Sequence, residues 1–276
     1  MHCFHTTAIA GGGGDPHFSA FGGIFFTWQG HCDAILARIP GQTDNNNDDD
    51  DDTTEAGLEI HVRTRRVRNW SSIDVVAVKA GRHVLEIGSE EGKLLLNGSE
   101  VESVDEDSLI VSSTRLKKRT VSYRFVFDGD KNLDVEVNTR SRMIFVSLSG
   151  NYPEDTIGLV GSPRRPGLFA RGGRDMTVKD VNEFVESWQV RDDDPRLFLT
   201  TRAPQFPAKC LYSMREVRDS AAAAVGRRLK EIRGAVTVEE ANEACATHDS
   251  GPLKTFCVED TIATGDFESA QDVFYG

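Results

Sequence analysis

The fold is decided by the stretch Gly14-Asp15-Pro16-His17-Phe18-Ser19-Ala20-Phe21 and its continuation Phe25-Phe26-Thr27-Trp28-Gln29-Gly30-His31-Cys32. Asp15-Pro16 predicts a turn, because the proline ring fixes its own φ and biases the preceding residue towards extended backbone. The aromatic residues that follow are typical of strands, since they give large apolar areas to segments too short for helices. The chain therefore opens with a rigid turn, two short strands and a half-cystine.

Strand patterns continue from Leu58 towards the middle of the chain. Apolar and polar residues alternate over 58–63, 121–127 and 133–137. This period of two predicts half-buried antiparallel strands. His61, like His83, is expected on a strand surface or in a structural hydrogen bond.

Turn residues lie between these runs. Glu91-Gly92, Asn97-Gly98 and Asp128-Gly129 suit hairpin turns, which need residues that tolerate positive φ. Residues 143–148 are apolar on both faces and predict a central strand. Roughly ten strands without intervening helices predict a mainly β chain, an antiparallel β-sandwich followed by a small α-helical C-terminal region.

We divide the chain into three parts. Residues 1–12 predict a flexible N-terminal lead, residues 13–190 the sandwich, and residues 191–276 a linker and a helical, cysteine-bearing segment. Within the sandwich, residues 43–56 include five consecutive aspartates and predict a disordered acidic insert, because such a run repels itself and has nothing to bury. Weak attraction for calcium is the alternative for this insert.

Two signals predict helices in the C-terminal part. Apolar residues from Val217 to Ile232 recur at spacings of three and four, and Gly234 is placed to end that helix. Thr237 and Glu240 have the spacing of a capping box at the start of a second helix.

Charge and hydropathy exclude some classes of partner. The formal net charge is −12, which argues against sequence-independent binding to nucleic acid or to an anionic membrane surface. No apolar run approaches the length of a membrane span. The first residues lack the basic and apolar regions of a signal peptide, so the chain is either cytosolic or a mature segment or fragment of a longer protein.

Five cysteines are spread widely along the chain, without a Cys-x-x-Cys pair; they are Cys3, Cys32, Cys210, Cys245 and Cys257. This spread suits disulfides in an oxidising compartment better than a zinc site. The spacing alone leaves the connectivity open.

Two basic clusters stand out in an acidic chain, namely Arg63, Arg65, Arg66 and Arg68, and then Arg115, Lys117, Lys118 and Arg119. They predict either a surface for sulphated or carboxylated polysaccharide or outward strand faces that discourage edge pairing. Asn69-Trp70-Ser71 and Asn97-Gly98-Ser99 are N-glycosylation sequons near predicted strand ends.

The opening motif resembles that of a von Willebrand factor type D domain, with Gly-Asp-Pro-His-Phe, a Phe-Gly-Gly turn and Phe-Thr-Trp-Gln-Gly-His-Cys. The closing segment is similar too, with Gly158-Leu159-Val160-Gly161 and an Asn-x-Phe-x-x-Ser-Trp pattern ending at Trp188. The resemblance covers about residues 13–270. It implies a secreted protein or a cell-surface ectodomain, of which this chain is a mature segment or fragment.

The same resemblance implies a disulfide pairing. It pairs Cys32 with Cys210 and then Cys245 with Cys257. The family partner of Cys3 lies in a Gly-Leu-Cys-Gly motif, where this sequence has Val160. Cys3 is therefore expected to be free or to bridge to another chain, which would give a homo-oligomer.

Family members often hold calcium between a Phe-Asp-Gly turn and an Asn/Asp-rich loop. Here the turn is Phe21-Gly22-Gly23 and the loop is Ser162-Pro163-Arg164-Arg165-Pro166. A missing carboxylate and two added cations remove much of what binds a hard cation. Asp175 alone remains where a ligand is expected, so we predict that the family's calcium site is lost.

Asp15-Pro16-His17 is the one constellation that suggests chemistry. The carboxyl group of Asp15 can attack its own carbonyl to form an anhydride while the protonated Pro16 nitrogen leaves, and His17 would supply the proton. Some members of the family cleave themselves at this motif and others stay intact. The alternative is a structural turn.

No conventional enzyme signature is present in the sequence. We therefore expect a non-enzymatic extracellular structural or adhesive interaction module that binds other extracellular proteins or glycans. The alternatives are a self-processing domain that cleaves at Asp15-Pro16, and a calcium- or glycan-dependent binding domain that uses residues 44–52 or the arginine clusters.

Overall fold

The computed structural model describes residues 8–13, 16–39, 57–67, 70–106, 109–127, 131–201, 210, 236–246 and 252–264. Several sequence predictions lie outside these residues: Cys3, Asp15, the acidic insert 43–56, Asn69, the Asp128-Gly129 turn and the helix over 217–232.

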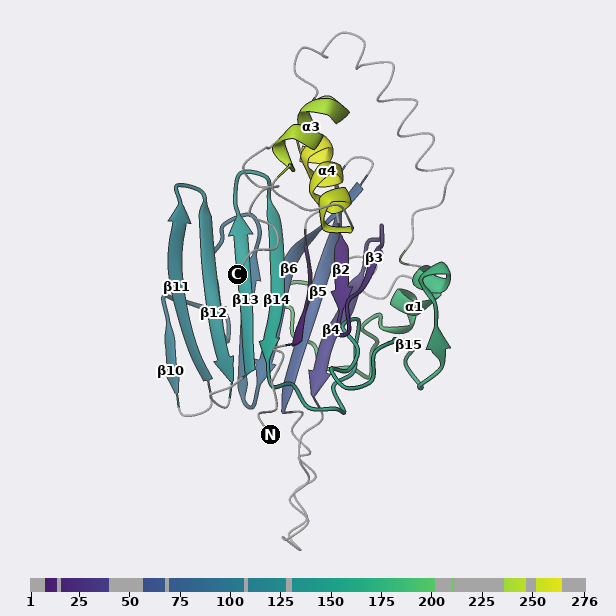
Figure 1. Ribbon diagram of the computed structural model, residues 1–276. Coiled ribbons are helices and arrows are strands. Elements are labelled where there is room, and N and C mark those ends of the chain that lie inside the picture. Colours follow the sequence, from purple (N-terminus) through teal and green to yellow (C-terminus); the bar gives the residue numbers. More distant parts are fainter. Residues whose placement is uncertain are drawn as a thin grey trace, which may run out of the picture.

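Two antiparallel sheets pack face to face and form the predicted sandwich (Figure 1). The eight-stranded sheet contains, in spatial order, β10 (Val104–Glu106), β11 (Leu109–Lys117), β12 (Thr120–Phe127), β13 (Lys131–Asn138), β14 (Met143–Gly150), β1 (Ala8–Gly13), β2 (His17–Ala20) and β3 (Ile24–Thr27). The six-stranded sheet contains β4 (Asp33–Ile39), β5 (Leu58–Val67), β6 (Trp70–Ala80), β7 (His83–Gly88), β8 (Leu94–Leu96) and β9 (Ser99–Val101).

Smaller elements complete the fold. They are the two-stranded pair β15 (Leu168–Phe169) and β16 (Asp175–Met176), the 3-10 helix η1 (Val178–Asp180), and the helices α1 (Val181–Ser187), α3 (Val238–Ala244) and α4 (Pro252–Thr264). The capping box predicted for Thr237 and Glu240 is confirmed at the start of α3. The turns at Gly92 and at Asn97-Gly98 have the positive φ angles that their sequences predict.

The described strands number sixteen, more than the roughly ten that the sequence predicts. The difference comes from β8, β9, β10, β15 and β16, which have only two or three residues each. Such short strands hold too few residues to show an alternation of two.

The flexible lead predicted for residues 1–12 is wrong for residues 8–12. These residues belong to β1, which pairs with β14 on one side and with β2 on the other. A β-carbon at Gly11 would lie 1.9 Å from the carbonyl oxygen of Val146. The glycine run therefore permits a close approach between strands rather than providing flexibility.

Strand β14 is central, as its apolar sequence predicts, because it lies between β13 and β1. The half-buried pattern predicted for β5 is wrong, since Glu59, His61 and Arg63 are buried together with the apolar residues between them. Residues 194–200 approach this second face of β5, where Asp194, Phe198 and Thr200 contact its charged network.

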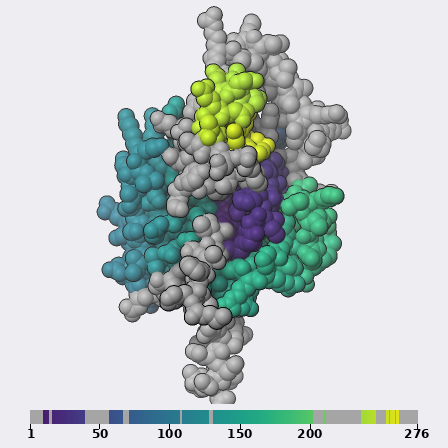
Figure 2. Space-filling model, in the orientation of Figure 1, coloured from purple at the N-terminus to yellow at the C-terminus, as the bar shows by residue number. Residues whose placement is uncertain are grey.

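The closing segment covers the free edge of β4. The backbone N–H of Ile35 donates to the carbonyl of Trp188 (2.9 Å), and that of Val190 donates to the carbonyl of Asp33 (2.8 Å). Further along the same edge, the N–H groups of residues 159 and 160 donate to the carbonyls of residues 35 and 36. In the space-filling view the purple N-terminal strands lie between the teal strands and the green closing segment (Figure 2).

Candidate functional site

Pro16 lies in the connection from β1 to β2, and His17 is the first residue of β2. The carbonyl of Pro16 accepts a hydrogen bond from the backbone N–H of Trp28 (3.1 Å), which fixes the turn against the residues that follow β3. Asp15, the third member of the candidate self-cleavage set, lies outside the described residues. The structure therefore places two of the three candidates side by side in a buried turn.

The ring of His17 is fully buried between β3 and α4. Its Nδ1 lies 2.8 Å from Oγ1 of Thr27, and its Nε2 lies 3.6 Å from Oε2 of Glu259. Burial lowers the pKa of His17 to about 4 and raises the pKa of Glu259 above its ordinary value. At neutral pH the ring of His17 is uncharged. It can donate a proton readily only after acid has protonated it.

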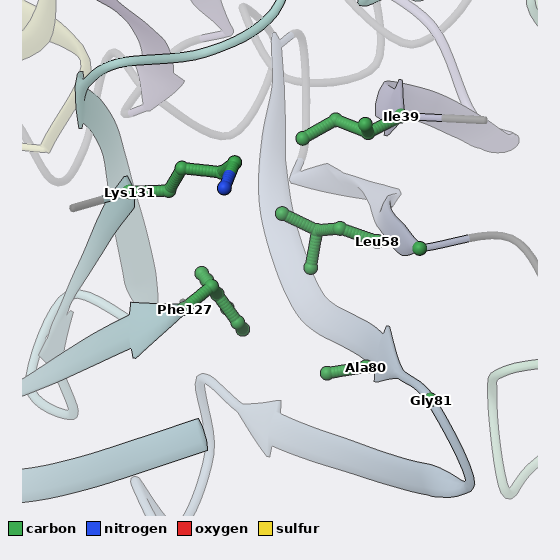
Figure 3. A pocket seen from close by; sticks show the side chains of 7 residues that line it. Ile39, Leu58, Ala80, Gly81, Phe127 and Lys131 are labelled. Atoms are coloured by element: carbon green, nitrogen blue, oxygen red, sulfur yellow. The ribbon is translucent and has the colours of Figure 1, made fainter. Parts of the chain in front are cut away.

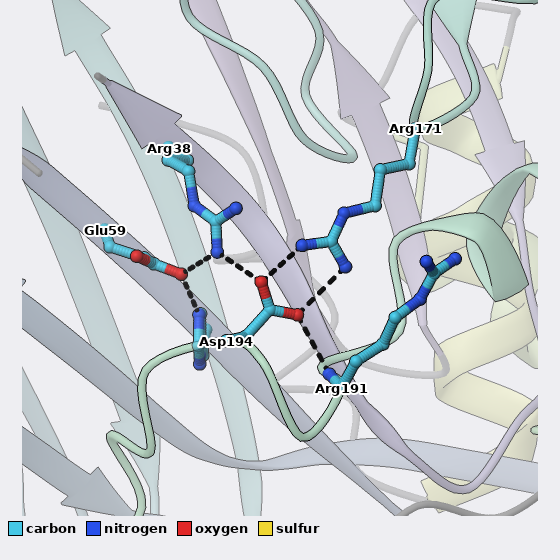
Figure 4. Close-up of polar contacts among 6 residues, drawn as sticks. Arg38, Glu59, Arg171, Arg191 and Asp194 are labelled. Atoms are coloured by element: carbon cyan, nitrogen blue, oxygen red, sulfur yellow. Dashed lines mark hydrogen bonds and ion pairs between the residues drawn. The ribbon is translucent and has the colours of Figure 1, made fainter.

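A buried charged network joins the residues after the closing segment to the six-stranded sheet (Figure 4). Asp194 accepts hydrogen bonds from Arg38 (2.8 Å) and, through both carboxylate oxygens, from Arg171. Arg38 also donates to Glu59, which lies 2.6 Å from Nε2 of His61. Burial alone would raise the pKa of Asp194, but the hydrogen bonds from the two arginines outweigh it and hold that pKa well below its ordinary range.

Arg63 forms a second buried group beside this network. Its guanidinium donates two hydrogen bonds to the carboxylate of Asp33 (2.9 and 2.8 Å) and one to the carbonyl of Thr200 (2.8 Å). The ring of Phe198 lies 4.2 Å from its central carbon. The polysaccharide and edge-protection interpretations are therefore both wrong for Arg63, which is buried on an interior strand.

Four cysteines form two disulfides, Cys32–Cys210 and Cys245–Cys257. These are the pairs that the resemblance implies. The first closes a separation of 178 residues and joins the core to the chain beyond the closing segment. The second links the end of α3 to α4, where the two cysteines form a small cluster of their own.

The turn Phe21-Gly22-Gly23 and the loop of residues 162–166 approach each other closely at Gly22 and Pro166. A β-carbon on Gly22 would lie 2.7 Å from the ring of Pro166, and the guanidinium of Arg165 stacks 4.0 Å from the ring centre of Phe169. Asp175 is exposed on β16. Within the described part of the chain, His, Cys, Asp and Glu side chains form no group of three or more that could hold a metal ion.

A small pocket opens at one end of the sandwich (Figure 3). It has a volume of about 70 Å³ and is lined by Ile39, Gly57, Leu58, Ala80, Gly81, Phe127 and Lys131. Pockets for drug-sized ligands have volumes of roughly 300–1,000 Å³. This pocket is therefore too small to serve as a substrate site.

The remaining candidates lie on the surface. Asn97 is exposed in the β8–β9 turn, where its Oδ1 accepts a hydrogen bond from the N–H of Val84 (3.0 Å). The residues from Ser112 to Arg119 are all exposed at the end of the β11–β12 hairpin. The Nε2 of His83 lies 2.8 Å from a carboxylate oxygen of Glu106.

Comparison with a family model identifies the class of protein. The model of the von Willebrand factor type D domain matches residues 11–162, more than half of the chain, and the chain belongs to this family. Domains of this family are typical of extracellular proteins, mediate protein interactions and are generally not enzymes. Among the described residues, no helix has the length and apolar character that crossing a membrane requires.

Sequence reasoning missed the buried charged network. Asp194 belongs to an acidic run that reads as a linker, and Arg38 and Arg171 carry no motif. A weak signal was present in β5, where three charged or polar residues share one face of a long strand. That face needs a polar cover if it is buried, because charged groups are buried only when they are paired.

Proposed function

We propose that this chain is a non-enzymatic structural or adhesive interaction module of a secreted or cell-surface protein. The observation that carries the proposal is the disulfide between Cys32 and Cys210, which joins a fully buried core residue to the chain beyond the sandwich. Disulfides persist in oxidising compartments outside the cytosol. Family membership supports the same location and an interaction role.

The test is secretion from a eukaryotic cell line, followed by intact mass measurement with and without reducing agent. Two bridges are expected in the secreted monomer, and a dimer that disappears in Cys3→Ser would assign an intermolecular bridge to Cys3. Beads coated with the secreted protein should attach to surfaces coated with extracellular proteins more than beads coated with reduced and alkylated protein. Absence of the bridges, or equal attachment of both kinds of bead, would contradict the proposal.

Asn97 is the proposed glycan site of this module. Because its Oδ1 is held by Val84, the amide nitrogen that carries an N-linked glycan is directed away from that hydrogen bond in an exposed turn. The secreted protein should lose mass on treatment with an N-glycosidase, and Ser99→Ala should lack the portion due to Asn97. An unchanged mass in Ser99→Ala would rule this site out.

We also propose that the family's calcium site does not operate here. The contact between Gly22 and Pro166 places apolar atoms where two ligand-bearing loops meet in the family. Calorimetric titration with calcium should give no heat of binding from a site at the two loops. Deletion of residues 43–56 removes any calcium binding by the acidic insert from the measurement. Heat of calcium binding that persists in this deletion variant would contradict the proposal.

Self-processing at Asp15-Pro16 is the second candidate, and the position of His17 favours it. The histidine directly follows the bond that would break, and Glu259 lies 3.6 Å from its Nε2. In the proposed step, a carboxylate oxygen of Asp15 bonds to its own carbonyl carbon, the carbon–nitrogen bond to Pro16 breaks, and the Pro16 nitrogen takes the proton of His17. Water then opens the anhydride and restores two carboxyl groups.

The low pKa of His17 confines this step to acid. Incubation near pH 4 should yield an N-terminus at Pro16, whereas incubation at pH 7 should leave the chain intact. Asp15→Ala should abolish the cleavage. His17→Gln distinguishes catalysis by the fold from the ordinary acid lability of an Asp-Pro bond, because equal rates in this variant would leave the motif as a structural turn.

A further inference from the structure

Two neighbouring turns bring exposed cations together at one end of the eight-stranded sheet. The β11–β12 turn carries Lys118 and Arg119, and the β13–β14 turn carries Arg140. The N–H of Thr139 donates to the carbonyl of Arg119 (2.9 Å), so the two turns are in contact. Figure 1 shows both turns at the same end of the sheet, where β11 and β13 finish.

We define the basic turn surface as Arg115, Lys117, Lys118, Arg119 and Arg140. All five residues are exposed. Within the described chain, the ion pairs do not include Arg115, Lys118, Arg119 or Arg140. Other exposed arginines do have carboxylate partners, such as Arg124 with Asp134 (2.7 Å) and Arg142 with Glu90 (2.9 Å). Four residues of the basic turn surface, namely Arg115, Lys118, Arg119 and Arg140, therefore carry positive charge that no ion pair among the described residues neutralises.

This concentration of charge contrasts with the rest of the molecule. The chain has a net charge of −12, so the molecule as a whole repels a long polyanion, which can be attracted only where cations gather. Arginine and lysine together suit sulfate groups, because the planar guanidinium donates two parallel hydrogen bonds and the ammonium acts as a compact point charge.

Exposed Phe, Tyr and Trp side chains are absent from the described surface, whose exposed large hydrophobic residues are all aliphatic. Single-stranded nucleic acids rely on stacking of bases on aromatic rings as well as on charge. A sulfated polysaccharide has no bases to stack and needs only spaced cations. The chemistry of the surface therefore favours the polysaccharide.

From these observations we propose that the basic turn surface binds sulfated polysaccharide chains of the extracellular matrix. This inference rests on the proposed extracellular function and names a class of partner for it. Edge protection is a second consequence of the same residues, because among the described strands β11 pairs only with β12 beyond Val111.

The experiment measures binding of the purified full chain to immobilised heparin as salt is raised. The test variant combines Arg115→Ala, Lys118→Ala, Arg119→Ala and Arg140→Ala. The matched control combines Arg82→Ala, Arg124→Ala, Arg164→Ala and Arg174→Ala, which removes the same charge from exposed arginines that have carboxylate partners. Circular dichroism and thermal melts verify that both variants fold.

We expect the test variant to lose heparin affinity by at least about tenfold at low salt. Each cation that contacts the polyanion releases counterions, so the loss of binding free energy grows with the number of cations removed. The control should change by less than about twofold, since its cations are already neutralised. Equal losses in both variants, or no binding by the natural chain, would overturn the proposal.

Further ligands separate the proposed partner from other anions. Desulfated heparin should bind more weakly than heparin, and duplex DNA and phosphatidylserine vesicles should bind more weakly at the same salt. Equally tight binding of DNA or vesicles would overturn the assignment to polysaccharide. Attachment of coated beads to surfaces free of polysaccharide should persist in the test variant, which keeps this inference distinguishable from the proposed function.

Discussion

Strands β5 and β11 carry basic runs that look alike in sequence and lie in opposite environments. β5 has a neighbour on each side, and residues 194–200 approach its second face, so Arg63 is buried in ion pairs. β11 is an edge strand over most of its length, and Arg115 to Arg119 are exposed. The difference teaches that burial of a charged strand is decided by residues far away in the sequence, here by more than 130 positions between Arg63 and Thr200.

The largest expected effect comes from removing the disulfide Cys32–Cys210, which joins the core to the chain beyond residues 194–200. Cys32→Ser with Cys210→Ser should lower the free energy of unfolding by about 5 kcal/mol, because the disulfide closes a separation of 178 residues. Urea unfolding followed by the fluorescence of the buried Trp28 and Trp188 measures the loss.

The second disulfide supplies the control for this prediction. Cys245–Cys257 closes a separation of only 12 residues, from the end of α3 to α4. Cys245→Ser with Cys257→Ser should shift the tryptophan transition much less. A shift as large as that of the first pair would show that the helices and the sandwich unfold as one unit.

The next effect tests the buried arginine directly. Arg63→Ala leaves the carboxylate of Asp33 buried without its bidentate partner and removes the contact with Phe198. Removing one member of a buried pair costs about 3–5 kcal/mol. The measurement is the midpoint of urea unfolding at constant m-value.

A double variant sharpens the interpretation of that loss. Arg63→Ala combined with Asp33→Ala should lower the free energy of unfolding by less than the sum of the two single variants. The second change removes the buried carboxylate that the first leaves without a partner. Additive losses, or a loss below about 1 kcal/mol for Arg63→Ala, would show that the pair is not buried as the structure has it.

His17 extends the comparison to a buried base that stays uncharged. Its pKa in the folded state is about 4, below the ordinary value of 6.5. Between these values the unfolded chain binds the proton and the folded chain does not, so stability falls with acidity by about 1.4 kcal/mol per pH unit. Above pH 6.5 both states are neutral and the contribution does not change.

Urea unfolding at several pH values between 4 and 7 measures this slope. His17→Gln should flatten it, whereas the carboxylates of Glu59 and Asp194 act at lower pH, because their pKa values lie below the ordinary range. An equal slope in the variant and the natural chain would assign the titration to other groups.

The sequence predicts the fold to the extent that local patterns report it. The aromatic strands near His17, the central β14 and the turns at Gly92 and Asn97 follow from residue types and spacing. Local patterns do not predict strand β1. Three consecutive glycines indicate a flexible segment unless the close approach of Val146 is known. The sequence does not predict the Asp194 network either, because no local pattern shows that the acidic run before Pro195 lies against β5.

The smallest expected effect on stability belongs to the basic turn surface. Lys118→Glu with Arg119→Glu should change the free energy of unfolding by less than about 0.5 kcal/mol, because both side chains are exposed and lack ion-pair partners among the described residues. Charge of either sign discourages pairing along the free edge of β11. Solubility should therefore be preserved in the variant while heparin binding is lost, whereas aggregation together with preserved binding would show that the positive charges protect the edge and have no polysaccharide partner.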